Sequence, residues 1–159
     1  MDRVGKEIHD DQTSISEILK SLRRKRGLRA VDVAQAMGMP LRSYEHFEAG
    51  AGRLNSERIH QFADAIGVDP FAIFAALDMG SSAFASRCAD NKLMTVLIMT
   101  LQNFDAQAGD DISRLAASTL IAAFTRCFDE LTSQANAQDA FVERWMAEKA
   151  PRPSGEPKA

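Results

Sequence analysis

Polar side chains that can recognise a partner by hydrogen bonding are concentrated in one short stretch, LRSYEH at residues 41–46. Arg42, Glu45 and His46 follow one another at spacings that place them on the same face of a helix. A guanidinium donates two parallel hydrogen bonds, a carboxylate accepts them, and an imidazole can do either. This combination suits the recognition of polar edges, such as those of nucleic-acid bases, better than it suits catalysis.

The remaining sequence offers no set of residues typical of an active site. Cys88 and Cys127 are far apart, and His9, His46 and His60 are scattered, so neither residue type has metal-ligand spacing. No Ser/His/Asp set, carboxylate pair or glycine-rich phosphate loop is present. We therefore expect a protein that is not an enzyme and that holds neither a metal nor a cofactor.

The charge of the chain is unevenly distributed. The 159 residues carry a formal net charge of −3, yet residues 20–58 contain nine Lys or Arg against four Asp or Glu. A local cationic surface is typical of proteins that bind polyanions, although a solvated helix face gives the same count. We interpret the run Arg23–Arg26 as such a solvated face. The segment Leu93–Leu101 is too short to span a bilayer and the N-terminus has no apolar core, so we expect a cytoplasmic protein without membrane contact.

Five short helices are predicted in the N-terminal half, over residues 15–26, 30–37, 41–48, 55–66 and 70–77. The second ends at Gly38 and the third begins directly after Pro40. A short glycine-containing turn between two helices at a steep angle is a helix-turn-helix unit. Tyr44 and Phe47 would anchor the third helix, so that its polar face points outward.

The C-terminal half is predicted to form three more helices after a small, polar linker. We place them at residues 90–106, 111–134 and 138–149. The first is apolar nearly all round and must be buried, either by a partner subunit or by docking onto the first five helices. We expect homodimerisation through this region, although an intramolecular core is an alternative role for the same residues. The candidate residues are Leu97, Leu101, Phe124, Phe128 and Trp145.

Residues from about Ile18 to Ile73 resemble the lambda-repressor-like (XRE, or Cro/CI) DNA-binding domains. The residues that carry the resemblance are Leu19, Leu22 and Arg23; Gly27 and Leu28; Val33, Ala34, Met37 and Gly38; Phe47, Glu48 and Gly50; and Ile59, Phe62, Ala63, Ala65, Ile66, Gly67 and Val68. The sequence departs from the family where Arg29 and Ala30 replace a polar cap and a phosphate-binding Gln, and where Pro40 replaces a Ser or Thr cap. No Ser/Lys pair of a self-cleaving peptidase domain stands out in the rest of the chain.

The resemblance implies an all-α protein, with a five-helix lambda-repressor-like helix-turn-helix domain followed by a C-terminal dimerisation region of about three helices. The expected division is a flexible N-terminus (1–13), a helix-turn-helix DNA-binding domain (14–78), a linker (79–89), a helical dimerisation domain (90–150) and a disordered tail (151–159).

The resemblance also implies roles for individual residues when the third helix lies in the major groove of double-stranded DNA. Arg42 would contact guanine; Glu45 would contact cytosine or else hold Arg42 in position; His46 would contact a base or a phosphate, and Leu41 a thymine methyl. Ser43, Arg53 and Asn55 would contact the backbone, and Arg29 could replace the lost Gln contact.

The expected function is that of a sequence-specific transcriptional regulator, more specifically a repressor, bound as a homodimer to an inverted-repeat operator and thereby associated with the nucleoid. Two alternatives stay open. One is a protein-interaction adaptor that kept the fold but binds little DNA. The other is a regulator whose C-terminal helices enclose a small apolar effector.

Overall fold

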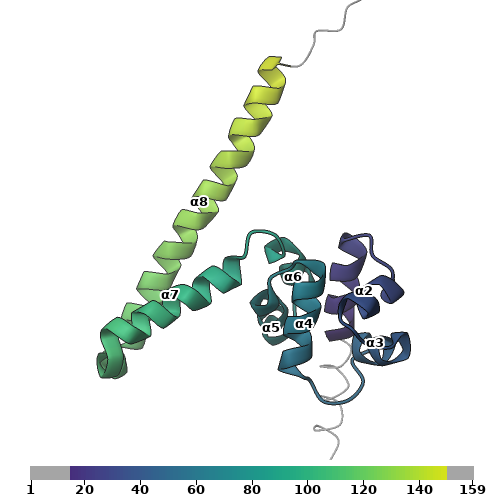
Figure 1. The fold of residues 1–159 in the computed structure, drawn as a ribbon. Coiled ribbons are helices and arrows are strands. Elements are labelled where there is room, and N and C mark those ends of the chain that lie inside the picture. Colours follow the sequence, from purple (N-terminus) through teal and green to yellow (C-terminus); the bar gives the residue numbers. More distant parts are fainter. Residues whose placement is uncertain (1–14, 150–159) are drawn as a thin grey trace, which may run out of the picture. The chain divides into compact units, whose positions relative to one another are not determined.

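The computed structural model describes residues 15–149, and these residues are helical with no strand. A first helix covers residues 15–25. It is followed by α2 (Ala30–Ala36), α3 (Leu41–Glu48), α4 (Ser56–Ile66), α5 (Pro70–Met79), α6 (Ser82–Cys88), α7 (Leu93–Ala108), the 3-10 helix η1 (Gly109–Arg114) and α8 (Ala117–Lys149) (Figure 1). The all-α expectation is confirmed. The expected flexible N-terminus and disordered tail lie outside the described residues.

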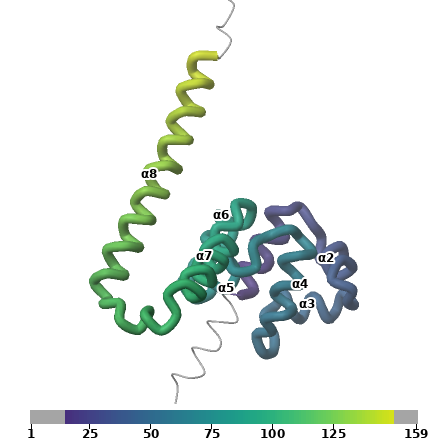
Figure 2. Tube along the Cα trace, turned by 60° about the vertical axis from the view of Figure 1, so that its left-hand side comes forward, coloured from purple at the N-terminus to yellow at the C-terminus, as the bar shows by residue number. Residues whose placement is uncertain are grey.

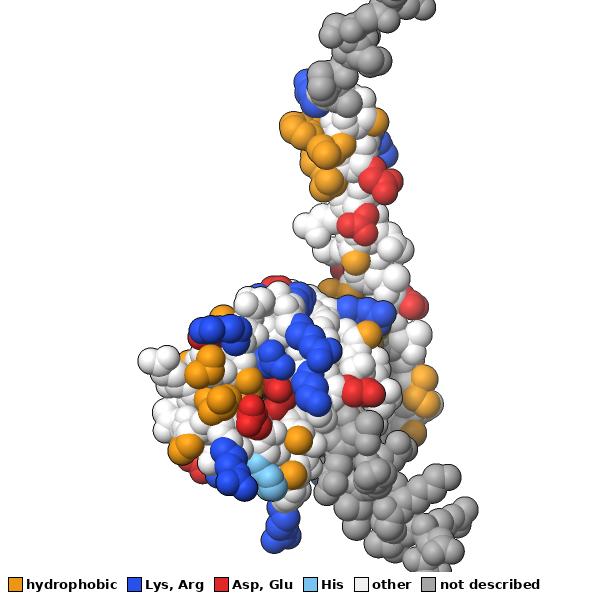
Figure 3. Space-filling model, turned by 90° about the vertical axis from the view of Figure 1, so that its right-hand side faces the viewer, with side chains coloured by type: hydrophobic (Ala, Val, Ile, Leu, Met, Phe, Trp, Pro, Cys, Tyr) orange, Lys and Arg blue, Asp and Glu red, His pale blue; other side chains and the backbone are white. Residues whose placement is uncertain are grey.

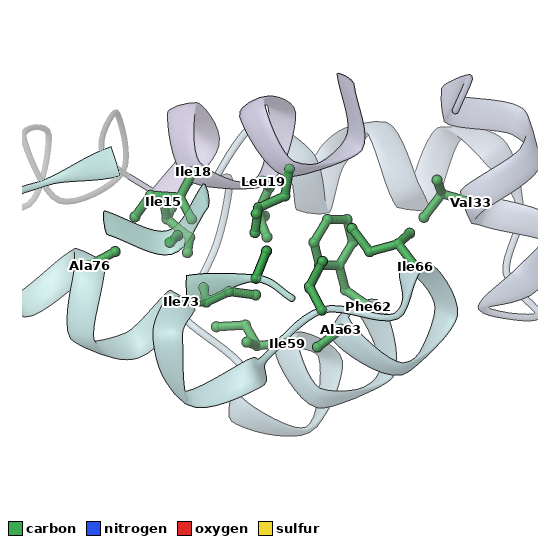
Figure 4. Close-up of a cluster of buried hydrophobic side chains, with 14 of the residues drawn as sticks. Ile15, Ile18, Leu19, Val33, Ile59, Phe62, Ala63, Ile66, Ile73 and Ala76 are labelled. Atoms are coloured by element: carbon green, nitrogen blue, oxygen red, sulfur yellow. The ribbon is translucent and has the colours of Figure 1, made fainter. Parts of the chain in front are cut away.

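Apolar side chains from the first helix, α2, α4 and α5 meet in one core (Figure 4). Ile18, Leu19, Phe62 and Ile73 are almost completely buried. These residues come from helices that are too short to be stable alone in water, so their stability depends on this packing. The sequence pattern predicted all five helices of this region within a few residues of their observed ends.

The expected linker over residues 79–89 is not observed, because α6 lies there and packs on the domain. Its Ala85 and Cys88, with Ala89 directly after it, are buried. Small side chains allow the helix to approach the core closely, which is why a stretch of Ala and Ser that reads as a linker is instead part of the fold. The helix-turn-helix core thus continues beyond residue 78.

The N-terminus of α7 is attached to the domain by a buried carboxylate. Asp69 caps α5 by accepting from Phe71 N (3.0 Å), and it also accepts from Thr95 N (3.0 Å) and Thr95 Oγ1 (2.8 Å). Beyond this turn α7 differs from the expectation, because no residue of it is buried. Docking of its apolar surface onto the first five helices, one of the two alternatives, is therefore not what the described chain does.

One continuous helix replaces the two that were expected over residues 111–134 and 138–149. α8 runs for 33 residues without interruption (Figure 2). The polar stretch SQANAQ at residues 133–138 suggested a break, but it contains neither Gly nor Pro and is rich in Ala, the best helix former. No residue of α8 is buried within the described chain.

The chain divides into two units, residues 1–107 and 108–159. The first contains the helix-turn-helix core, α6 and nearly all of α7, and the second contains η1 and α8. This boundary lies later in the sequence than the linker we expected. Within the described residues, no helix is long and apolar enough to cross a membrane.

Candidate nucleic-acid interface

The helix α3 has one buried face and one exposed face. Tyr44 is fully buried and Glu48 is 5% exposed, whereas Arg42, Glu45 and His46 are exposed. Figure 3 faces the side on which α2 and α3 lie in Figure 1, and it shows Lys and Arg side chains spread over this surface with a histidine among them. The predicted separation of anchoring and presented residues is therefore observed.

The polar side chains on the exposed face are not bonded to other side chains of the described chain. Among residues 15–149, no hydrogen bond or ion pair involves the side chains of Arg42, Glu45 or His46. Glu45 consequently does not hold Arg42 in position in the free protein, which was one of its two expected roles. All three groups can offer their full hydrogen-bonding capacity to a partner.

The turn that orients α3 depends on the backbone of Gly38. Gly38 has φ +65°, a left-handed conformation that side chains with a Cβ rarely adopt, and it lies directly after the C-cap of α2. Met39 N donates to Ala34 O (3.0 Å), which closes the end of α2. Pro40, in an extended conformation, then serves as the N-cap of α3. The corner predicted from Gly38-Met39-Pro40 is thus present.

A buried ion pair fixes the other end of α3. Arg23 of the first helix donates from Nε to Glu48 Oε1 (2.5 Å) and from Nη2 to Glu48 Oε2 (3.1 Å). Tyr44 Oη donates to the same Oε1 (2.8 Å), and Arg23 Nη1 also donates to the Leu28 carbonyl oxygen (3.1 Å). We call Arg23, Tyr44 and Glu48 the α3 clamp. Burial first, and then the hydrogen bond to Glu48, raises the pKa of Tyr44 above its ordinary value.

The sequence pattern did not predict the α3 clamp, nor the contacts that the basic residues Arg23–Arg26 make within the domain. Arg23 belongs to the clamp, and Arg26 donates to the carbonyl oxygens of Ile66 (3.0 Å) and Gly67 (2.7 Å) and to Asp90 Oδ1 (2.6 Å). Lys25 donates to the Ser86 carbonyl oxygen. The interpretation of Arg23–Arg26 as a solvated face is therefore wrong for Arg23 and Arg26, whereas Lys25 is exposed although it donates a hydrogen bond. These contacts stabilise the domain, and only Arg24 is exposed without such a contact among the described residues.

Arg29, at the N-cap of α2, is paired with an acidic neighbour. Its Nε and Nη2 donate to the two carboxylate oxygens of Asp32 (2.9 and 2.8 Å). Hydrogen bonding to Arg29 lowers the pKa of Asp32, so the pair is charged at neutral pH. A phosphate that approached Arg29 would have to compete with this carboxylate. The predicted contact of Arg29 with DNA would thus be made by a side chain whose charge Asp32 already partly neutralises.

The loop after α3 and the start of α4 hold the remaining predicted backbone contacts. Arg53 and Asn55 are exposed, and Ser43 is partly buried. Asn55 Oδ1 accepts from Arg58 N (3.1 Å) and so caps α4. Because the cap uses the oxygen, the side-chain amide nitrogen of Asn55 can still donate to a phosphate. Leu41, the predicted apolar contact, is 39% exposed beside Arg42.

The comparison with known families agrees with this geometry. Residues 15–71 match the model of a family described as a helix-turn-helix domain. The match contains the first helix, α2, α3, α4 and the start of α5, whereas α6, α7 and α8 lie outside it. Searches of curated proteins and of solved structures gave no match. The region is therefore similar to a helix-turn-helix domain. The finer resemblance to lambda-repressor-like domains stays a prediction.

Proposed function

We propose that this protein is a sequence-specific transcriptional regulator that binds double-stranded DNA through α3 in the major groove. The observation that carries the proposal is the exposed face of α3, where the side chains of Arg42, Glu45 and His46 make no hydrogen bond or ion pair among the described residues. A single helix fits the major groove, where an arginine that contacts guanine O6 and N7 is the commonest specific contact. In this proposal the protein acts by binding and not by catalysis.

The proposed roles of the flanking residues follow from where they lie. Ser43, Arg53 and the amide nitrogen of Asn55 contact phosphates, and Leu41 contacts a thymine methyl. Arg29 contributes less than its charge suggests, because Asp32 already accepts two of its hydrogen bonds. Phosphate contacts set affinity and salt dependence, while the contacts of Arg42, Glu45 and His46 set sequence preference.

The regulator acts as a homodimer on an inverted repeat and represses transcription. One recognition helix reads only a few base pairs, so two copies with their α3 helices about 34 Å apart supply the specificity that an operator needs. A small dimer over a promoter blocks RNA polymerase without further components, which favours repression. The protein would work in the cytoplasm, on the nucleoid.

Selection from random duplexes, followed by binding measurements at two salt concentrations, tests the proposal. We expect an inverted repeat to be enriched. With roughly six to ten phosphate contacts per dimer, affinity should fall about 10³- to 10⁵-fold between 50 and 200 mM salt. Arg42→Ala should cost about 1–3 kcal/mol on the selected site and relax the choice of base at one position in each half-site.

Arg87→Ala is the matched control, because Arg87 is an exposed arginine of the same domain that lies on α6 and outside the α2–α3 surface. It should leave both affinity and base choice unchanged. Equal losses for the two variants would refute the role of Arg42. Failure to bind any duplex at low salt would refute the proposed function and favour the adaptor alternative, for which the exposed Val31 and Leu41 would be the natural contacts.

A further inference from the structure

The helix α8 carries large apolar side chains that nothing in the described chain covers. Nine of them are between 36% and 66% exposed: Leu120, Ile121, Phe124, Phe128, Leu131, Phe141, Val142, Trp145 and Met146. Figure 3 shows hydrophobic side chains gathered on one side of the upper part of this helix. Scattered apolar residues are ordinary on a surface, but large apolar residues that gather on one side of a helix mark an interaction surface.

Apolar residues follow one another at spacings of three and four residues from Leu120 to Leu131 and again from Phe141, and two glutamines continue the same spacing between them. This spacing is the pattern of a coiled coil. We define the α8 seam as Leu120, Phe124, Cys127, Leu131, Gln134, Gln138, Phe141 and Trp145. Ile121, Phe128 and Val142 form a second row directly beside it. No seam position is charged, and the acidic and basic residues between Ala117 and Trp145 lie on other faces, so the seam can be buried without burying an ion.

The size of this surface fits a second copy of the chain. A buried aromatic side chain contributes roughly 150–250 Å², so each half-exposed Phe or Trp of α8 can still bury about 100 Å². The four aromatic side chains together supply roughly 400 Å². The five aliphatic ones raise the total toward the roughly 800 Å² that one partner contributes to a stable interface. Two identical helices that pair in parallel and in register place each residue of the seam opposite its own copy.

The two glutamines, together with the length of the α8 seam, favour the parallel orientation. In a parallel pair, Gln134 and Gln138 each face their own copy, and an amide both donates and accepts, so such pairs can satisfy each other. In the antiparallel register that brings Phe124 opposite Phe141, Gln134 faces Leu131 and Gln138 faces Cys127. A buried amide without a partner is destabilising, so this antiparallel register is disfavoured. An antiparallel register shifted by seven residues pairs Gln134 with Gln138, but it leaves Leu120 and Phe124 beyond the end of the other copy's seam and so buries less apolar surface.

We propose that two copies of the chain pair in parallel along the α8 seam, with Leu120, Phe124, Leu131, Phe141 and Trp145 packed against their counterparts and Cys127 facing Cys127. This pairing gives the surface and the orientation of the dimer that the proposed function requires, and the inference rests on the proposed function in that respect. Parallel pairing brings the N-terminal ends of both α8 helices together, and the chain leads from these ends to the two helix-turn-helix domains, which can then act on one operator.

Cys127 gives the proposal a native probe. In the parallel pair the two Cys127 thiols lie at the same level of the seam. In the antiparallel register in which Cys127 faces Gln138, the two Cys127 residues lie about 16 Å apart along the axis at 1.5 Å per residue. Two cysteines can be joined only when their Cα atoms are within about 7 Å. The second cysteine, Cys88, is buried in the other unit and burial raises the pKa of its thiol, so it should not react.

The experiment uses the full chain without DNA, so that its result is independent of the proposed function. Sedimentation equilibrium should give a dimer at micromolar concentration. Diamide, which takes up two electrons and two protons as two thiols join, should convert that dimer into a disulfide-linked form seen on a non-reducing gel. Cys88→Ala should still be linked, and Cys127→Ser should remain a dimer that cannot be linked.

A matched pair of variants tests the surface itself. Phe124→Glu places a charge in the seam and should raise the dimer dissociation constant at least 100-fold, while Thr125→Glu places the same charge on an adjacent residue outside the seam and should change it less than threefold. A monomeric wild type, or a dimer that diamide does not link, would overturn the proposal. A linked parallel dimer that ignores DNA would overturn the proposed function alone.

Discussion

Removing the charge of Glu48 should lower the free energy of unfolding of the helix-turn-helix domain and leave the exposed face of α3 unchanged. In the α3 clamp this carboxylate accepts from Arg23 and Tyr44, and the two ionised side chains are only 16% and 7% exposed. Glu48→Gln keeps the shape of the side chain and one acceptor oxygen, but it leaves the Arg23 guanidinium without its counter-charge.

The expected cost follows from how deeply the pair is buried. Breaking a fully buried pair costs about 3–5 kcal/mol, and the remaining exposure of Arg23 lets water replace part of the lost interaction, so we expect about 2–4 kcal/mol. In a domain of this size each 1 kcal/mol lowers Tm by roughly 4–8 °C, so the domain transition should move down by at least 8 °C. Arg23→Met should cost a similar amount, because it leaves the carboxylate unpaired.

The double variant provides the decisive measurement. When both charges are removed, neither is left buried without a partner. The loss of stability in the variant that combines Arg23→Met with Glu48→Gln should therefore be smaller than the sum of the two single losses by at least about 1 kcal/mol. Urea unfolding followed by circular dichroism at 222 nm, at one fixed protein concentration, gives the four free energies of unfolding. Glu45→Gln, on the exposed face of the same helix, should change stability by less than about 0.5 kcal/mol. Additive effects in the cycle, or equal losses for Glu45→Gln and Glu48→Gln, would refute the assigned role of the clamp.

Two further predictions concern single side chains. Tyr44 is the one tyrosine of the chain. Because burial and its bond to Glu48 raise its pKa, its contribution to stability is complete below about pH 10, the pKa of an unfolded tyrosine, and is lost as pH rises above it. Tyrosinate absorbance at 295 nm should therefore appear only well above pH 10 and together with loss of helix, whereas in urea it should appear near pH 10; a native chain that titrates normally would contradict the burial. Thr95→Val removes one hydrogen bond to Asp69 and should cost about 1 kcal/mol and speed amide exchange in the first turn of α7, while Thr100→Val, in the same helix, removes only a bond to Val96 O and should do neither. Equal exchange in the two variants would show that Asp69 does not hold α7.

Local signals predicted most of the helix-turn-helix domain. Asn55 and Asp69, both of residue types that favour helix N-caps, cap α4 and α5, and Gly38 and Gly67 follow the ends of α2 and α4 in the left-handed conformation. These features depend on residues within one turn of each other. The α6 helix was missed because Ala85 and Cys88 contribute little hydrophobic signal, although their spacing of three residues is that of a helix face.

The interactions that could not be predicted join residues that are far apart in the sequence. Arg23 and Glu48 are separated by 25 positions, and Asp69 and Thr95 by 26. Nothing in a single sequence shows which of several arginines will meet which acid. The break expected within α8 was wrong for a different reason. Residues 133–138 are polar, but they contain neither Gly nor Pro, and this lack is the better indicator that a helix continues.

The short length of α3 explains why the domain needs the clamp. Eight residues form barely two turns, and a helix of this length is not stable in water without tertiary contacts. Its exposed face can supply none of these contacts if Arg42, Glu45 and His46 are to remain available for DNA. The orientation of that face must therefore come from Tyr44 and Phe47, which pack against the core, and from Glu48, which Arg23 of the first helix holds. It follows that residues presented by α3 can be exchanged with little effect on folding, whereas a change in the clamp would disturb DNA binding without altering any group that touches a base.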